Sequence, residues 1–384
     1  MMRKIKKTYK RLTRPKYYEN CIEASYSIGF FRKIFGVSVY TVKSAPGGRI
    51  VAQFTYLGFI CFVSWYVAYF LCVYRIYSTD QTILRTLYNT KLQRYGDDVE
   101  RLSTTIYVIY TMWKLPFDVH VDVHYMQLII DIDKAIERLG EPINFSKHAR
   151  FYVTSVFTFA ITALGLLITW LSIGSLKATI PLEKVFQVVY SDTLTLVSTA
   201  RYCGYLYLLA SRYKILNKIL ASIDAPKART KLLVVQGKIG GRITNTLQFQ
   251  DDSTNERLRS CGKIYGMLYE ATETANRKFG LSLALTLLLC LIIIVLYLFY
   301  FMEATASGLF SDIQKYIDFL IYVFWQIGFA LGVIYLNVYF SENTAKITSF
   351  VIHNIINSEI NPQVRTEVCF YVVWCPSCPL RKVI

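Results

Sequence analysis

Residues 279–302 read FGLSLALTLLLCLIIIVLYLFYFM, a run of twenty-four residues without a charged side chain. At about 1.5 Å of rise per residue, a helix of this length crosses the roughly 30 Å hydrocarbon core of a bilayer. Arg277 and Lys278 precede the run and Glu303 follows it. Because Lys and Arg accumulate on the cytosolic side of membranes, the run predicts a membrane span that starts in the cytosol.

The composition favours a membrane protein over a nucleic-acid-binding one. The chain has 384 residues, is 54% hydrophobic and 15% aromatic, and carries 43 Lys and Arg against 26 Asp and Glu, for a net charge of +17. In a water-soluble protein that charge would suggest a nucleic-acid partner, but water would not tolerate the long apolar runs found here. The first sixteen residues are basic with no apolar stretch behind them, so we expect no cleavable signal peptide and a cytosolic N-terminus.

Six spans are predicted, which leaves both ends of the chain in the cytosol. The second span is required by parity. Without it, residues 212–278, with thirteen Lys and Arg against six acids, would lie outside while the basic N-terminus lies inside. The fold class is therefore all-α, a polytopic membrane helix bundle, and its expected spans are residues 50–74, 102–123, 151–176, 185–211, 279–302 and 319–341.

Three parts of the chain follow from these spans. Residues 1–49 form a cytosolic N-terminal segment with twelve Lys and Arg, and its middle part mixes apolar and basic residues as an interfacial or packing helix does. Residues 50–341 form the bundle, with a long cytosolic loop at 212–278 whose ends should extend the neighbouring helices. Residues 342–384 form a cytosolic C-terminal segment, whose sequence changes in character after residue 368.

Asp192 is costly to place in the fourth span, so it should face a wet cavity or a partner rather than lipid. Arg201 lies nine positions on, about 180° round the helix, and cannot simply pair with it. A ligand or ion pathway and an internal hydrogen bond to another helix both remain open for Asp192. Gly328 and Gly332 form a small-xxx-small pattern that permits two helices to pack closely. Static packing within one subunit is the favoured interpretation, and a contact that repacks during gating is the alternative.

Asp118, His120, Asp122 and His124 alternate in a way that resembles a metal cluster. On a helix only positions four apart share a face, so the two histidines would supply half a site, and a polar helix end is the favoured interpretation. We therefore expect no metal and no cofactor. The sequence also contains no Gly-rich phosphate loop and no nucleophile elbow, so we expect no enzyme.

Two stretches carry a family resemblance. The run IYGMLYEATETANRKFGLSLALTLLLCLIIIVLYLFYFMEA, residues 264–304, resembles the penultimate-loop region of insect gustatory receptors. The segment SENTAKITSFVIHNIINSEINPQVRTEV, residues 341–368, is similar to the cytosolic helix before the last span of that family. The family's motif of Thr-Tyr, five apolar residues and Gln-Phe is absent, because the chain continues as CFYVVWCPSCPLRKVI. We expect a truncated form without the seventh, pore-lining helix, which does not conduct by itself.

The resemblance implies a chemosensory receptor subunit of the plasma membrane, a ligand-gated non-selective cation channel for small tastants. It also implies a homo- or hetero-tetramer with other receptor subunits, surrounded by membrane lipid, and a ligand pocket in the outer half of the bundle. Aromatic rings with polar tips offer stacking and a hydrogen bond together, although Tyr and Trp also gather at membrane interfaces. The expected ligand contacts are Tyr107, Tyr110, Trp170, Tyr190, Asp192, Tyr297, Tyr300, Tyr322 and Trp325.

Two other functions remain open at this stage. A small-solute transporter would be expected to show internal repeats and discontinuous helices, and the sequence has no matching halves. A non-conducting regulatory partner of full-length receptor subunits would fit the missing last span.

Overall fold

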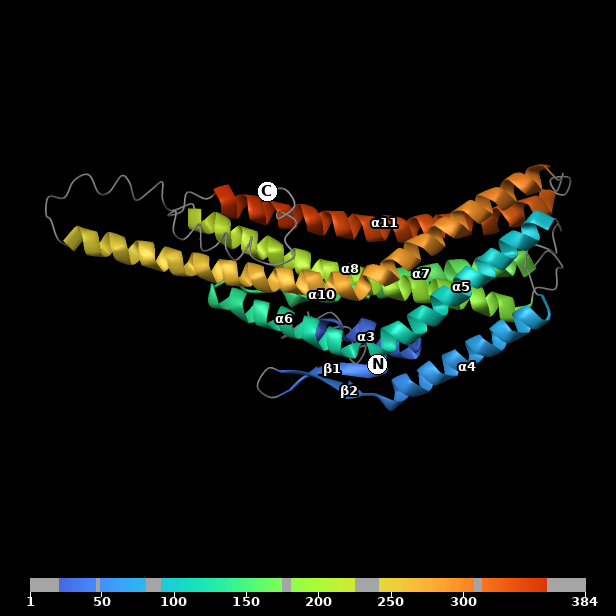
Figure 1. Ribbon diagram of the computed structural model, residues 1–384, viewed down its shortest axis with the longest axis horizontal. Coiled ribbons are helices and arrows are strands. Elements are labelled where there is room, and N and C mark those ends of the chain that lie inside the picture. Colours follow the sequence, from blue (N-terminus) through green and yellow to red (C-terminus); the bar gives the residue numbers. More distant parts are fainter. Residues whose placement is uncertain are drawn as a thin grey trace, which may run out of the picture. The chain divides into compact units, whose positions relative to one another are not determined.

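A computed structural model of the chain describes residues 21–45, 49–80, 91–174, 181–224, 242–306 and 313–357. Nearly all of these residues lie in helices, as the sequence predicts, and one two-stranded hairpin is the exception to an all-α fold. The elements (Figure 1) are α2 Cys21–Ala24, α3 Tyr26–Ile34, β1 Tyr40–Ser44, β2 Ile50–Phe54, α4 Tyr56–Ser78, α5 Lys91–Phe117, α6 Val119–Arg138, α7 Phe145–Gly174, α8 Leu182–Asp224, α10 Arg242–Ala306 and α11 Ile313–Asn357.

Three helices in the described part of the chain are long and apolar enough to cross a membrane. They lie at Tyr56–Ser78, Glu256–Ala306 and Phe319–Phe350. The first, fifth and sixth expected spans fall largely on these helices. The other three spans, and the cytosolic position of the N-terminus, stay predictions.

The chain divides into two compact units. Unit 1 consists of residues 1–119, 144–197 and 295–327, and unit 2 of residues 120–143, 198–294 and 328–384. The helices α8, α10 and α11 each contribute residues to both units. On the expected topology, the parts of these three helices in unit 1 are their outer ends.

The N-terminal part of unit 1 differs from the expected first span. Strand β2 pairs antiparallel with β1, with Tyr40 opposite Phe54 and Ser44 opposite Ile50, so the helix α4 starts only at Tyr56. The chain crosses itself closely here, because a Cβ on Gly58 would lie 2.5 Å from the Ser38 carbonyl oxygen. The expected start at residue 50 is wrong, since an uncharged run suits a strand as well as a helix.

The second expected span, residues 102–123, is not one helix. The helix α5 begins earlier, at Lys91, and ends at Phe117, one residue after Pro116. Residue Asp118 is not helical, and α6 begins at Val119. Proline has no backbone N–H and disturbs the helix around it, which explains why the run breaks at this position.

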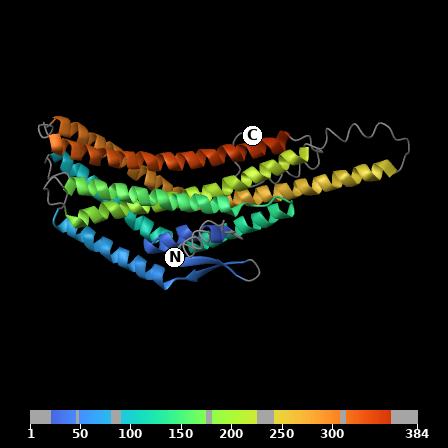
Figure 2. The same cartoon turned by 180° about the vertical axis from the view of Figure 1, so that it is seen from behind.

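Unit 2 is built from long helix segments that run beside one another, seen from opposite sides in Figures 1 and 2. The helix α8 continues without interruption to Asp224, and α10 is already helical from Arg242. The prediction that the ends of the long loop extend their neighbouring helices is thus confirmed. The helix α11 continues to Asn357, past the expected end of the sixth span at residue 341.

Candidate functional site

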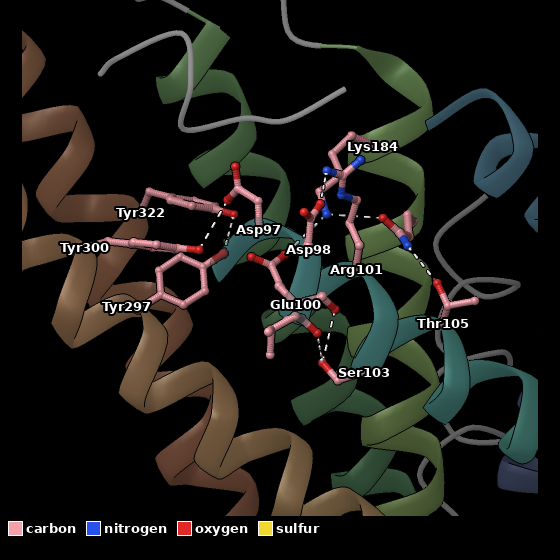
Figure 3. Close-up of polar contacts among 12 residues, drawn as sticks. Asp97, Asp98, Glu100, Arg101, Ser103, Thr105, Lys184, Tyr297, Tyr300 and Tyr322 are labelled. Carbon is pink, nitrogen blue, oxygen red and sulfur yellow. Dashed lines mark hydrogen bonds and ion pairs between the residues drawn. The ribbon is translucent and has the colours of Figure 1, made fainter. Parts of the chain in front are cut away.

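Three tyrosines form a buried cluster in unit 1 (Figure 3). The helix α10 supplies Tyr297 and Tyr300, one turn apart, and α11 supplies Tyr322. The hydroxyls of Tyr297 and Tyr322 lie 2.8 Å apart, with ring centroids 5.5 Å apart. The rings of Tyr297 and Tyr300 meet edge to face at 5.7 Å. The structure therefore brings together three of the residues that the sequence singled out as ligand contacts.

The helix α5 reaches this cluster through Asp97. The hydroxyl of Tyr300 donates a hydrogen bond to Asp97 Oδ1 at 3.2 Å (Figure 3). The preceding residue is Gly96, where a Cβ would lie 2.5 Å from the Tyr300 hydroxyl oxygen. Only glycine leaves room for this approach, so the start of α5 and the end of α10 are fitted to each other.

A second carboxylate of α5, Glu100, connects this helix to α8. The buried Lys184 ammonium donates to Glu100 Oε1 at 3.3 Å and to Gln187 Oε1 at 3.2 Å. The Gln187 amide in turn donates to the Thr105 hydroxyl at 3.4 Å. Lys184 thus neutralises Glu100.

The buried cation Arg101 is bonded to acids at the surface. Its guanidinium donates to Asp80 at 2.9 Å and to Asp98 at 2.6 Å. Both carboxylates are exposed, while the side chain of Arg101 is not. The positive charge of Arg101 is therefore balanced by these two surface carboxylates.

Asp192 on α8 is 4% exposed, and its Oδ2 has no hydrogen-bond partner among the described residues. The internal hydrogen bond considered for Asp192 is not formed in the described part of the chain. A ligand or ion pathway remains open for it.

Further buried polar atoms of unit 1 lack partners among the residues that the structure describes. Four of them lie on three helices, α5, α10 and α11. Buried polar groups in proteins are nearly always hydrogen-bonded, to protein, water or ligand, so these atoms mark an interior suited to a polar guest. They are Thr111 Oγ1, Glu303 Oε2, Trp325 Nε1 and Gln326 Nε2.

Tyr190 belongs to an aromatic stack between α4 and α8. Its ring lies 5.1 Å from Trp65, 5.8 Å from Phe186 and 5.7 Å from Tyr69, as centroid distances. Trp65 is also anchored to α3, because its Nε1 donates to the carbonyl of Ile34 at 2.7 Å. This stack packs against the part of α8 that carries Asp192.

The remaining expected contacts lie on three helices of unit 1. Tyr107 is buried on α5, and Tyr110 is half-buried one turn further on. Trp325 on α11 packs on Gly165 of α7, where a Cβ would lie 2.1 Å from the ring. Trp170 lies in α7, with its side chain outside the described part of the structure.

Gly328 and Gly332 lie on α11 with open space around them. A Cβ added at either would meet nothing within 4 Å among the described residues. That part of the chain brings no helix onto this pair, so close packing at the two glycines stays a prediction.

Unit 2 contains a buried ionic network that the sequence did not reveal. The carboxylate of Asp122 on α6 accepts hydrogen bonds from Arg201 and Tyr205 on α8 and from Lys278 on α10. Asp122, Arg201 and Lys278 are all buried. The partner of Arg201 is therefore Asp122, which agrees with the helical argument that Arg201 cannot pair with Asp192 along its own helix.

A second buried pair joins α6 to α8. The guanidinium of Arg212 donates to both oxygens of Asp133 at 2.9 Å. Burial raises the pKa of the Asp133 carboxyl, and the charge of Arg212 opposes that shift. Burial also raises the pKa of Tyr213 to about 12, which keeps its hydroxyl protonated beside Thr272 at 3.3 Å.

The histidines and aspartates that resembled a metal cluster bond to different partners. Asp122 enters the ionic network, whereas the exposed His124 lies 3.4 Å from Glu270. Within the described ranges, no three His, Cys, Asp or Glu side chains are grouped so that they could hold a metal ion.

Asp97, Glu100 and Lys184 were missed because they lie just outside the expected spans at 102–123 and 185–211. A signal for them was present in the sequence. Residues 97, 100 and 101 are spaced three and four apart, the spacing of neighbours on one helix face. An outward extension of the second helix would have placed Asp97 and Glu100 on α5.

Comparison with models of protein families matches residues 28–377 to the family described as 7tm chemosensory receptor. The match covers most of the chain and reaches from α3 beyond α11. Comparison with curated protein sequences gives no match.

Proposed function

This chain belongs to the 7tm chemosensory receptor family, and from that premise we propose that it is a gustatory-type receptor subunit forming a ligand-gated, non-selective cation channel for small tastants. Its place would be the plasma membrane, with the N-terminus in the cytosol, in a tetramer with itself or with other receptor subunits.

The observation that carries the ligand-binding part is the polar interior of unit 1. Four helices bring buried polar atoms without partners, among the described residues, to the unit that also holds the tyrosine cluster. Leaving a buried polar group unpaired costs about 1–3 kcal/mol. A bound small molecule with hydroxyl or amino groups would recover part of that cost, which supports ligand binding here.

Continuity of the helices suggests how binding would be transmitted. α8, α10 and α11 each run from unit 1 into unit 2 without a break in the helix. A ligand that favours one packing of their outer ends would bias the same helices further along, because packed helices have discrete alternative arrangements.

Whole-cell recording tests the channel proposal. The chain would be expressed alone and together with a family member that has the Thr-Tyr and Gln-Phe helix, and challenged with sugars, alkaloids and amines. A ligand-evoked current that is unchanged when Na⁺ is replaced by K⁺ supports the proposal. Uptake of a solute without current would instead identify a transporter, and no ligand-dependent current in either combination would reject the channel role.

A further inference from the structure

The chain that precedes the helix α4 folds back along it (Figure 1). The amide of Thr55 donates to the carbonyl of Val39 at 2.9 Å. Further along α4, Trp65 Nε1 donates to the carbonyl of Ile34, at the end of α3. Trp65 lies nine residues after Tyr56, about 14 Å along the helix. Because α4 is long and apolar enough to cross a membrane, the end of α3 lies within the bilayer rather than on its surface.

The end of α3 has its backbone polar groups satisfied at this depth. Gly36 has a φ of 69°, and its amide donates to the carbonyl of Lys33 at 3.0 Å. The amide of Val37 donates to the carbonyl of Arg32 at 2.8 Å, which completes a Schellman motif. A Cβ on Gly36 would lie 2.9 Å from Phe62 Cα, so glycine is needed for the close approach to α4. Unsatisfied backbone groups are not tolerated in the hydrocarbon region, and these bonds allow α3 to end there.

The same turn carries two positive charges. Arg32 and Lys33 lie in the last turn of α3, and both side chains are half-buried. The sequence contains no Asp or Glu from residue 24 to residue 79. Charged residues at membrane depth are costly and are retained where they meet a group of opposite charge. Long basic side chains reach such a group by extending toward the lipid headgroups.

An exposed apolar face accompanies these charges. Phe30 and Ile34, one turn apart on α3, are 47% and 38% exposed. The next aromatic ring, that of Phe35, packs on Trp65 instead, with centroids 6.3 Å apart. Apolar side chains beside basic ones match a phospholipid, which has a negative phosphate and apolar chains. An acidic protein segment would match the charges but not an apolar face inside the bilayer.

We propose that α3 binds an anionic phospholipid of the cytosolic leaflet. Lys33 donates to the lipid phosphate, the charge of Arg32 adds to the attraction, and Phe30 and Ile34 contact the acyl chains. The cytosolic leaflet is the one that is rich in anionic lipid. This inference goes beyond the proposed function and shares with it the cytosolic position of the N-terminus.

The test uses the full chain purified in detergent and two short-chain lipids, dioctanoyl phosphatidylserine and dioctanoyl phosphatidylcholine. Both have the same chains and a phosphate, but only the first has a net negative charge. Affinities are obtained from lipid-dependent thermal stabilisation. We expect phosphatidylserine to bind roughly fivefold more tightly or better, since each basic residue near anionic lipid contributes about that factor.

Lys33→Gln keeps a long polar side chain and removes its charge. It should weaken phosphatidylserine binding roughly fivefold and leave phosphatidylcholine binding unchanged. The matched control is Lys263→Gln, the same change at an exposed lysine of α10 that lies about 24 Å along the helix before Phe279. It should alter neither affinity.

A second measurement locates the lipid without any variant. Phosphatidylserine with a photoreactive group beside its phosphate should label residues 26–39 of the unaltered chain. An excess of unlabelled phosphatidylserine should prevent this labelling, whereas the same excess of phosphatidylcholine should not.

Three results would overturn the proposal: equal affinity for the two lipids, full phosphatidylserine affinity in Lys33→Gln, and labelling confined to other parts of the chain. Binding of free glycerophosphoserine as tight as that of the lipid would also overturn it, by assigning the site to a soluble anion. These measurements need no tastant, so their failure leaves the channel role untouched. Absence of ligand-evoked current would in turn reject the channel role and leave the lipid site standing.

Discussion

Units 1 and 2 differ in whether every buried acid has a charged partner. In unit 2 each of the buried acids Asp122 and Asp133 has a cation bonded to it, Arg201 and Lys278 for the first and Arg212 for the second. In unit 1 the buried Asp192 has no hydrogen-bond partner among the described residues. Charge pairs that are satisfied fix one arrangement of helices, and polar groups left unsatisfied are available to a ligand.

The difference assigns separate tasks to the two parts of α8. The part in unit 2 is tied to α6 and α10 through Arg201 and Arg212. The part in unit 1 carries Asp192 and is held by the aromatic stack around Tyr190 and by the bond of Lys184 to Glu100 on α5.

The largest expected effect comes from breaking a satisfied pair in unit 2. Asp133→Asn leaves the guanidinium of Arg212 buried without its carboxylate, and the loss of one partner from a buried pair costs about 3–5 kcal/mol. The free energy of unfolding, measured by denaturant titration in detergent, should fall by that amount.

The matched control is Asp131→Asn, on the same helix two residues away. The Asp131 carboxylate is half-exposed and lies 3.8 Å from Lys134, so its neutralisation should change stability little. Equal losses in the two variants would mean that burial of the pair is not what stabilises unit 2.

A smaller effect is expected from the packing of unit 1. Gly165→Ala would place a methyl group 2.1 Å from the ring of Trp325, which must then move. Overpacking of this kind costs about 1–3 kcal/mol, measured by the same denaturant titration. Gly328→Ala on α11, where a Cβ meets nothing within 4 Å of the described chain, is the control and should be neutral or stabilising.

A double variant shows whether the ring is the cause. Trp325→Leu shortens the side chain that the new methyl would strike, so Gly165→Ala should cost less in that background. Additive losses would place the strain elsewhere.

Long runs without charged residues correctly predicted the helices that form because of hydrophobicity alone. The run at 279–302 lies within α10, and the run at 319–341 lies within α11. The same criterion failed at residues 50–54, because backbone pairing with residues 40–44 decides there between strand and helix. Pairing partners distant along the chain cannot be derived from the composition of one segment.

The candidate site was predictable in its aromatic part and not in its charged part. Tyr297, Tyr300 and Tyr322 follow from the spans and their direction. Asp97 and Glu100 were not predicted, because the second span was taken to end where charged residues begin. A membrane helix can contain charged residues where they bond to neighbouring helices, as these two do. The pairing of Asp122 with Arg201 depends on how three helices are arranged, which spacing along one helix does not reveal.

The comparison also predicts a change of sign. In the ligand-free protein, Asp192→Asn removes a buried charge without a hydrogen-bond partner among the described residues, so it should stabilise the fold by about 1 kcal/mol. Asp133→Asn destabilises it. Denaturant titration of both variants measures the contrast directly, and a loss at Asp192 as large as at Asp133 would contradict a ligand-directed role for this carboxylate.

The smallest effect is expected from an exposed pair in unit 2. Glu141 Oε2 and the ammonium of Lys218 lie 2.8 Å apart, a distance as short as in the buried pair of Asp133 and Arg212, but the Lys218 side chain is largely exposed. Glu141→Gln should cost about 0.5 kcal/mol or less, because water solvates both charges when they separate. Any loss should shrink further at high salt, which screens exposed pairs. Denaturant titration at low and high salt checks this expectation. A large, salt-independent loss would show that ionic contacts stabilise unit 2 whether or not they are buried.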